Sequence, residues 1–221
     1  MKAAALFSGG KDSAYAIYLA QKQGIKVEHI VSLFPEKKDS WMFHSINIHL
    51  TKLLSESMNI NFIKKETQGE KEDELKDLEN ILKDLEIEGV VSGAIASEYQ
   101  KNRIQKICNN LKIKSITPLW GMNQEDVLRE LIKLGFKVII VGVFAEGLDE
   151  SWLGRKIDEK TLEKLMEIHN KYKINQAGEG GEFETLVLDG PIFNKKLVLD
   201  ETSVEWRRDS GVLKVKKAHL E

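Results

Sequence analysis

The chain has 221 residues, a formal net charge of −2 at pH 7, and 31% charged side chains. This near-neutral balance argues against a broad nucleic-acid-binding surface, and no apolar run approaches the length of a membrane span, so neither partner is expected. The single cysteine, Cys108, excludes an internal disulfide and a paired-cysteine metal or redox site, and with no visible signal peptide it favours a reducing, cytoplasmic location.

Short β-rich runs alternate with helical patterns over the first half of the chain. We expect strands at residues 2–7, 27–34, 61–65, 89–92 and 115–117. Between them, apolar spacing predicts helices at residues 12–23, 41–57, 71–85 and 99–111. This alternation is typical of a parallel, Rossmann-like α/β sheet with helices on both faces.

The second half begins with a helix at 124–134, a strand at 137–143 and a helix at 161–172. Four short β runs follow at 185–188, 196–199, 204–208 and 212–216, separated by turn-forming residues at 189–191, 200–201 and 209–211. This pattern predicts antiparallel hairpins. We therefore place a soft boundary near residue 120, between a nucleotide-binding domain (1–120) and a smaller C-terminal α/β lobe (121–221) that binds the substrate.

The sequence Ser8-Gly9-Gly10-Lys11-Asp12-Ser13 joins the first predicted strand to the first helix. Successive glycines allow positive φ angles, which turn backbone N–H groups toward one point, and the helix aims its positive dipole end there. The lysine adds a positive charge, the serines add hydroxyl donors, and the aspartate either holds Mg²⁺ or caps the helix. The motif lacks the spacing of P-loop NTPases. It predicts a phosphate site, with a plain glycine turn before a capped helix as the alternative.

A second polar loop follows the fourth predicted strand. Its Gly93 allows close approach of a ligand, and Glu98, Tyr99 and Arg103 lie at the start of the next helix. Ligands bind beyond the carboxyl ends of parallel strands, so this loop and the first glycine loop are expected at the same edge of the sheet. A polar helical turn capped by Ser97 is an equally good interpretation.

A third loop, GEGGEFET at 178–185, holds three glycines and three carboxylates within eight residues. Such a loop is suited to wrap a ligand, to hold Mg²⁺ through oxygen atoms, to pair with a cationic substrate, or to assist proton transfer from an amine. A flexible acidic turn is the competing interpretation.

Weaker signals remain open. His44 is either a ligand contact or a structural residue of a helix face, and the polar run 148–155 is suited to line a cleft. The basic hairpin around Trp206 and Arg207 is either a docking face or the solvated side of an edge pair. Leucine spacing in the charged stretch 64–88 favours an amphipathic helix with a solvated face.

Together these segments resemble the diphthine–ammonia ligase family, a branch of the PP-loop ATP pyrophosphatases. SGGKDS at 8–13 matches the superfamily's PP-loop, and EGGEFETLVLDGP at 179–191 is what singles out the family. Further matches lie at 42–44, 92–94, 98–103 and 148–155, so the resemblance spans nearly the whole chain. It implies an adenine nucleotide α-hydrolase type of Rossmann-like domain. The length, without the extra C-terminal domains of longer eukaryotic members, and the Lys/Glu-rich composition suit an archaeal member.

The resemblance implies the last step of diphthamide synthesis, in which ATP and Mg²⁺ drive amidation of diphthine on translation elongation factor 2 with ammonium. The reaction would pass through an acyl-adenylate and release AMP and pyrophosphate. The ATP site would comprise Ser8, Gly9, Gly10, Lys11, Asp12, Ser13, Ser32 and Gly93. The adenine would lie near Phe7, and Asp12 would contact Mg²⁺. The acceptor side would comprise His44, Glu98, Tyr99, Arg103, Asp149, Glu179, Gly180 and Gly181. Catalytic roles would fall to Lys11, Asp12, Glu182 and Glu184.

Two other functions compete with this one. An ATP pyrophosphatase acting on tRNA or on another carboxylate is the first, but tRNA-thiolating enzymes of the superfamily commonly use paired cysteines and would need a basic stripe. A non-catalytic nucleotide-sensing module is the second, and it predicts binding without turnover. Free ammonium is the simplest nitrogen source, because no glutaminase signature is evident and Cys108 is poorly placed as a nucleophile. A homodimer is compatible with the sequence, which does not argue for it.

Overall fold

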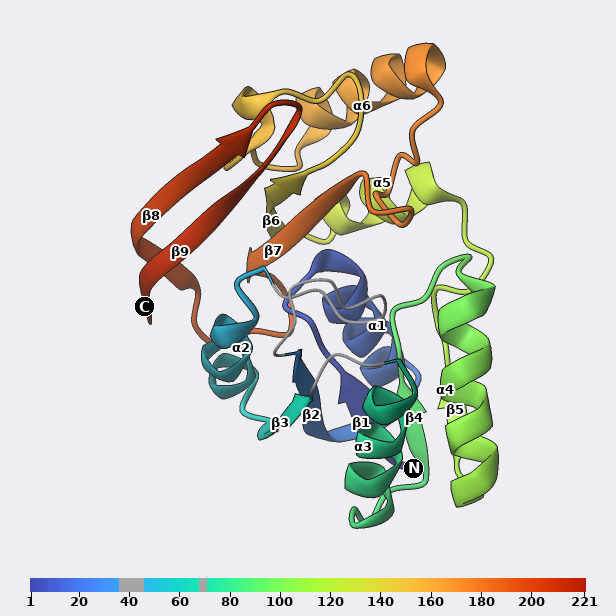
Figure 1. Ribbon diagram of the computed structural model, residues 1–221. Helices are drawn as coiled ribbons and strands as arrows, with labels where there is room; N and C mark the ends of the chain where they lie inside the picture. Colours follow the sequence, from blue (N-terminus) through green and yellow to red (C-terminus); the bar gives the residue numbers. More distant parts are fainter. Residues whose placement is uncertain (36–45, 68–70) are drawn as a thin grey trace.

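Five parallel strands form the sheet that carries the N-terminal half of the protein. The computed structural model describes residues 1–35, 46–67 and 71–221. The strands β1 (Lys2–Leu6), β2 (Lys26–Pro35), β3 (Asn61–Thr67), β4 (Gly89–Val91) and β5 (Lys114–Ile116) pair in the order β3-β2-β1-β4-β5 (Figure 1). The order reverses between β1 and β4, which creates the crevice where ligands bind in open α/β sheets. The Rossmann-like prediction is confirmed.

Helices cover both faces of this sheet. One buried cluster joins the sheet to α3 (Lys71–Lys83) and α4 (Glu98–Leu111) through side chains such as Leu33, Leu78 and Ile107. A second cluster joins the opposite face to α1 (Lys11–Lys22) and α2 (Thr51–Met58). Small alanines at the centre of β1 allow both helix layers to approach the strand closely.

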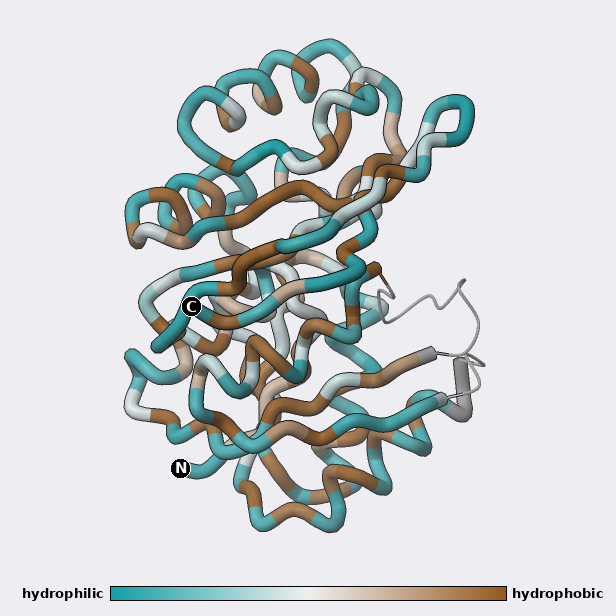
Figure 2. The backbone as a smooth tube through the Cα atoms, turned by 90° about the vertical axis from the view of Figure 1, so that its left-hand side faces the viewer, coloured by the Kyte–Doolittle hydropathy of each residue, from teal (hydrophilic) through white to brown (hydrophobic). Residues whose placement is uncertain are grey.

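A four-stranded antiparallel sheet forms the C-terminal lobe. Its order is β7 (Phe183–Asp189), β6 (Lys137–Val143), β9 (Ser210–Leu220) and β8 (Leu197–Arg207). In Figure 1 this sheet lies beyond α1, with α5 (Gln124–Lys133) beside it and α6 (Glu159–Tyr172) on its far side. Figure 2 shows mostly hydrophobic strands in the middle of the molecule and a hydrophilic tip on the β8–β9 hairpin. Within the described ranges, no helix is long and apolar enough to cross a membrane.

The predicted helix at 41–57 is only partly right over its described part. Only α2 is helical there, preceded by a 3₁₀ turn, Ile48–Leu50, while residues 41–45 lie outside the described residues. Asn47 interrupts the pattern because its φ is 58° and its side chain bonds to β9. Its amide Nδ2 donates to the carbonyl of Leu213 at 2.9 Å, and its Oδ1 accepts the N–H of Val215 at 2.9 Å.

The predicted turns in the C-terminal lobe need two corrections. The runs 196–199 and 204–208 belong to one strand, β8, and its pairing with β9 shifts register around Glu201 instead of turning there. Residues 189–191 do not form a hairpin turn, since β7 and β8 lie at opposite edges of the sheet. The hairpin that does form, β8–β9, turns at Arg208, whose φ is 55°.

Candidate active site

The loop between β1 and α1 is held by its own hydroxyl groups. Gly9 has a φ of +84°, but Gly10 is extended, so only one of the two glycines uses the left-handed region. Ser8 Oγ accepts the N–H of Gly10 at 3.4 Å, and Ser13 Oγ donates to the carbonyl of Gly10 at 3.0 Å. The helix begins at Lys11 with no side-chain cap, so of the two roles considered for Asp12 the helix cap is not observed.

Lys11 connects this loop to the C-terminal lobe. Its side chain is 3% exposed, and its Nζ donates to Asp12 Oδ2 at 2.9 Å and to the carbonyl oxygen of Ala177 at 2.5 Å. The ammonium also lies 5.6 Å from the centre of the Phe183 ring. The charge is therefore buried beside a carboxylate, at the junction of the two lobes.

Asp12 has one carboxylate oxygen without a partner among the described residues. Burial raises the pKa of Asp12, the neighbouring Lys11 ammonium opposes that rise, and the negative charges of Glu179 and Glu184 add to it. Its Oδ1 is buried and makes no hydrogen bond to the described residues. An orphaned carboxylate oxygen fits a cation such as Mg²⁺, which proteins bind through one or two carboxylates together with substrate phosphates. No cluster of three potential metal-ligand side chains occurs in residues 1–35, 46–67 and 71–221, so phosphate and water would complete such a site.

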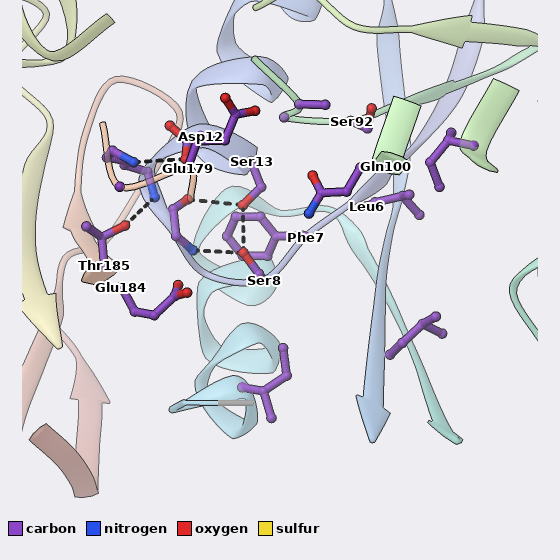
Figure 3. A pocket seen from close by; sticks show the side chains of 18 of the residues that line it. Leu6, Phe7, Ser8, Asp12, Ser13, Ser92, Gln100, Glu179, Glu184 and Thr185 are labelled. Atoms are coloured by element: carbon purple, nitrogen blue, oxygen red, sulfur yellow. Dashed lines mark hydrogen bonds and ion pairs between the residues drawn. The ribbon is translucent and has the colours of Figure 1, made fainter. Parts of the chain in front are cut away.

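A cavity opens at the carboxyl ends of β1, β2 and β4, where the strand order reverses (Figure 3). In Figure 3, Glu184 and Thr185 reach the glycine loop from one side, and Gln100 lies on the other. The predicted site residues that line this cavity are Ser8, Gly10, Lys11, Asp12, Ser13, Gly93, Glu179 and Glu184. The structure therefore brings the three polar loops together around one space.

The acidic glycine run (residues 178–185) and the first glycine loop (residues 8–13) contact each other directly. Thr185 Oγ1 accepts the backbone N–H of Lys11 at 3.1 Å, and the N–H of Val187 donates to the carbonyl of Gly9 at 2.9 Å. Strand β7 thus fixes the loop from the side. Thr185 lies in the predicted loop 178–185, but no role of its own is predicted for it, although its position directly after the three carboxylates is a usable signal.

Several predicted residues lie away from the cavity lining. Ser32 is 1% exposed and its Oγ donates to the carbonyl of Phe7 at 2.7 Å, so its neighbours Val31 and Leu33 line the cavity instead. Asp149 accepts the N–H of Ser151 at 3.0 Å and caps a 3₁₀ turn. The other predicted residues outside the lining are Gly9, Glu98, Tyr99, Arg103, Gly180, Gly181 and Glu182. His44 lies outside the described residues.

Helical rotation explains why the start of α4 was predicted imperfectly. Gln100 and Ile104 face the cavity, whereas Tyr99 and Arg103 pair with each other, with the guanidinium carbon 3.6 Å from the ring centre. Gly93 was expected to admit a ligand. It also admits α1, because an added Cβ would lie 2.7 Å from Asp12 C and from the following backbone nitrogen.

Known protein families match both lobes of the chain. Two family models match the chain, Diphthamide synthase N-terminal domain over residues 1–115 and Diphthamide synthase C-terminal domain over residues 123–220. The chain belongs to the diphthamide synthase family. The resemblance carried by 8–13 and 179–191 is thereby confirmed, while the domain boundary near residue 120 stays a prediction.

Curated relatives in the diphthamide synthase family agree. The diphthine–ammonia ligase of Mus musculus is 35% identical over 249 residues, covering 100% of this chain and 93% of that protein. The diphthine–ammonia ligase of Homo sapiens is 34% identical over 227 residues, covering 92% of this chain and 85% of that protein. Both are eukaryotic, so they do not support the archaeal origin that the composition suggested.

The similar solved structures include a predicted subunit of tRNA methyltransferase from Methanocaldococcus jannaschii. It covers 86% of this chain and 98% of that chain, with 17% identity and a TM-score of 0.49. Similarity at this level carries no functional argument.

In this member of the diphthamide synthase family, the two glutamates predicted to be catalytic have different surroundings. Glu184 lines the cavity and lies opposite Gly142 in the β6–β7 pair. Glu182 does not line it. Its Oε1 accepts the N–H of Asn175 at 2.8 Å, and its Oε2 is buried without a partner among the described residues. Glu184 is therefore the better placed of the two to meet a substrate.

Proposed function

We propose that the protein is a diphthine–ammonia ligase, which amidates the diphthine carboxylate of translation elongation factor 2 with ammonium and converts ATP to AMP and pyrophosphate. One observation carries the proposal: the glycine loop, suited to phosphate, and the acidic run of the family line a single cavity. Membership of the diphthamide synthase family supports the substrate. A cytoplasmic location is part of the proposal, because the protein substrate is a translation factor.

The chemistry explains why ATP is needed. A carboxylate is a poor acyl donor, since its leaving group would be oxide. When a carboxylate oxygen attacks the α-phosphorus of ATP, pyrophosphate leaves and an acyl-adenylate forms. Ammonium loses one proton to become ammonia, whose nitrogen attacks the acyl carbon. AMP then leaves, and the new nitrogen loses a second proton to give the neutral amide.

Residues around the cavity suit these steps. Backbone N–H groups at the start of α1, together with Lys11, would stabilise the charge that develops on the departing pyrophosphate. Asp12 would hold Mg²⁺, which neutralises phosphate charge. The apolar side chains of Phe7 and Leu33 would receive the adenine, and Glu184 would orient ammonium and accept its proton.

Product analysis tests the proposal. The purified protein is given ATP, Mg²⁺, ammonium and elongation factor 2 carrying diphthine, and each component is omitted in turn. We expect AMP and pyrophosphate in the complete mixture alone. AMP formed without the elongation factor would indicate a different acceptor. Tight ATP binding without turnover would contradict the ligase and favour a nucleotide-sensing module.

A further inference from the structure

We infer that Glu179 is a positioning residue. Its hydrogen bonds hold the loop after β4 against the C-terminal lobe, and so set the distance between these two walls of the nucleotide cavity. It had been expected to contact the acceptor substrate. In this role Glu179 makes no contact with diphthine or ammonium. Its kinetic test rests on the proposed function, whereas its structural test does not.

The carboxylate of Glu179 is already engaged within the protein. Its Oε1 accepts three consecutive backbone N–H groups, from Ile95 at 2.8 Å, Ala96 at 2.7 Å and Ser97 at 3.1 Å. These amides lie immediately before α4, so the positive end of the helix dipole also faces the carboxylate. Charge-assisted hydrogen bonds of this kind are stronger than neutral ones. One oxygen thus joins segments that are 82 to 84 residues apart.

The segment that carries Glu179 is braced from inside. Asn175 Oδ1 accepts the N–H of Ala177 at 2.9 Å and the N–H of Glu179 at 3.3 Å. Asn175 in turn donates its own N–H to Glu182 Oε1. A Cβ at Gly180 would lie 2.7 Å from that same Glu182 oxygen, so the glycine makes room for the bracing carboxylate. The backbone of the acidic glycine run is therefore held in one conformation by these hydrogen bonds, and the run is not a flexible turn.

The same segment is tied to both neighbouring helices. The carbonyl of Ala177 accepts a hydrogen bond from Lys11 Nζ, and the N–H of Gln176 donates to Gln124 Oε1 at 3.2 Å. Glu179 adds the tie to the opposite wall, since it and Ala94 both line the cavity. Removing its carboxylate would loosen that wall without removing Lys11, Asp12 or Glu184.

Two substitutions at this position separate geometry from charge. Glu179→Ala removes every acceptor, whereas Glu179→Gln keeps an oxygen that can accept the three N–H groups without a full charge. Glu167→Gln, on the exposed side of α6, is the matched control. Three properties are measured for each variant: equilibrium ATP binding without the other substrates, amide hydrogen exchange over residues 94–98, and steady-state kinetics.

We expect the alanine variant to exchange the amides of Ile95, Ala96 and Ser97 at least about tenfold faster, and its ATP Kd and KM to rise about tenfold. Its kcat should stay within about threefold of wild type, because no group acting in the transition state is lost. The glutamine variant should fall between the alanine variant and wild type, and the control should match wild type.

Two results would overturn the inference. The first is unchanged amide exchange and ATP binding in Glu179→Ala. The second is unchanged ATP binding with a raised KM for ammonium or for the elongation factor, which would place Glu179 on the acceptor. Amide hydrogen exchange and ATP binding need no turnover. Failure of the ligase proposal would therefore be distinguishable from failure of the positioning role of Glu179.

Discussion

Glu182 and Glu184 stand two positions apart on the chain, yet their surroundings assign them different roles. Glu184 lines the cavity, and Glu182 braces the backbone at Asn175. We expect Glu184→Gln to lower ammonium-dependent amidation about 100-fold, the lower range for loss of a general base. Turnover is measured over a range of ammonium concentrations, with Glu182→Gln for comparison. The Glu182 variant should unfold at a lower temperature than wild type, while its turnover should keep its dependence on ammonium concentration. Equal turnover of Glu184→Gln and wild type would remove Glu184 from the mechanism.

Cys108 makes a separate prediction about pH. The thiol is fully buried in α4, and burial raises the pKa of Cys108 to about 11, against a smaller lowering from the neighbouring Ser115. In the unfolded chain the thiol titrates near its ordinary value of about 8.5. Between these values the unfolded state loses the proton first, so the stabilising effect of the buried neutral thiol declines as pH rises.

Urea unfolding at pH 7.5 and at pH 10.5 measures that effect, with Cys108→Ala as the reference. We expect the free energy of unfolding to fall more steeply with pH for wild type than for the variant. Identical pH slopes would contradict the raised pKa. The folded thiol should also resist alkylation at pH 8, because the thiolate is the reactive form and is scarce there.

Sequence patterns located the polar loops but not the direction of each side chain. The loop motifs are recognised by residue type and spacing, so their prediction does not depend on the exact residue at which a strand or helix ends. Two of the side-chain errors are shifts of one position: Ser32 is predicted where Val31 and Leu33 line the cavity, and Tyr99 where Gln100 does. A strand reverses its face at every residue and a helix turns by about 100°, so a one-residue error moves a side chain out of the site.

Helix α6 depends on its N-terminal cap. Asp158 accepts the N–H of Thr161 at 2.9 Å, and that backbone hydrogen bond is the main reason why the pKa of Asp158 is lowered. Asp158→Ala should destabilise the protein by about 1 kcal/mol, and Asp158→Asn should retain most of the stability. Thermal unfolding at pH 7 measures both, and an alanine variant as stable as wild type would contradict the cap.

The sign of the pH effect follows from the lowered pKa of Asp158. Its ionised carboxylate stabilises the fold above its ordinary pKa of about 4, and the contribution declines as pH falls toward the folded value. The asparagine variant should lack this dependence, which comparison of thermal unfolding at pH 7 and pH 3.5 will reveal.

Local sequence signals predicted most helices and strands, and they failed where contacts with distant segments determine the local structure. The parallel sheet followed from strand and helix alternation, which is a property of each short window. The predicted helix at 41–57 begins too early, because Asn47 is bonded to Leu213 and Val215, more than 160 residues away. Strand β8 continues through Asp200 because β9 pairs along its length, so turn-forming residue types did not produce a turn.

At the scale of the whole molecule, the two lobes share one buried core. A single apolar cluster includes residues of β1, α1 and α2 together with residues of β6, β7 and α5. The ring of Phe136, from the C-terminal lobe, meets Tyr15 edge-on at 6.3 Å and Tyr18 at 6.0 Å. Polar ties cross the same boundary, since the N–H of Asn194 donates to the carbonyl of Ser57 at 2.9 Å. The two sheets therefore support each other.

A shared core predicts that both lobes unfold in one cooperative transition. Calorimetry of the wild type should give a single peak with equal calorimetric and van't Hoff enthalpies. Phe136→Leu keeps an apolar side chain but loses two aromatic contacts, each worth about 0.5–1.5 kcal/mol. The whole peak should then move to lower temperature without splitting, because neither lobe retains its core when the contact between them weakens. Two separate peaks, or a shift of only one part of the trace, would show that the lobes are independent folding units.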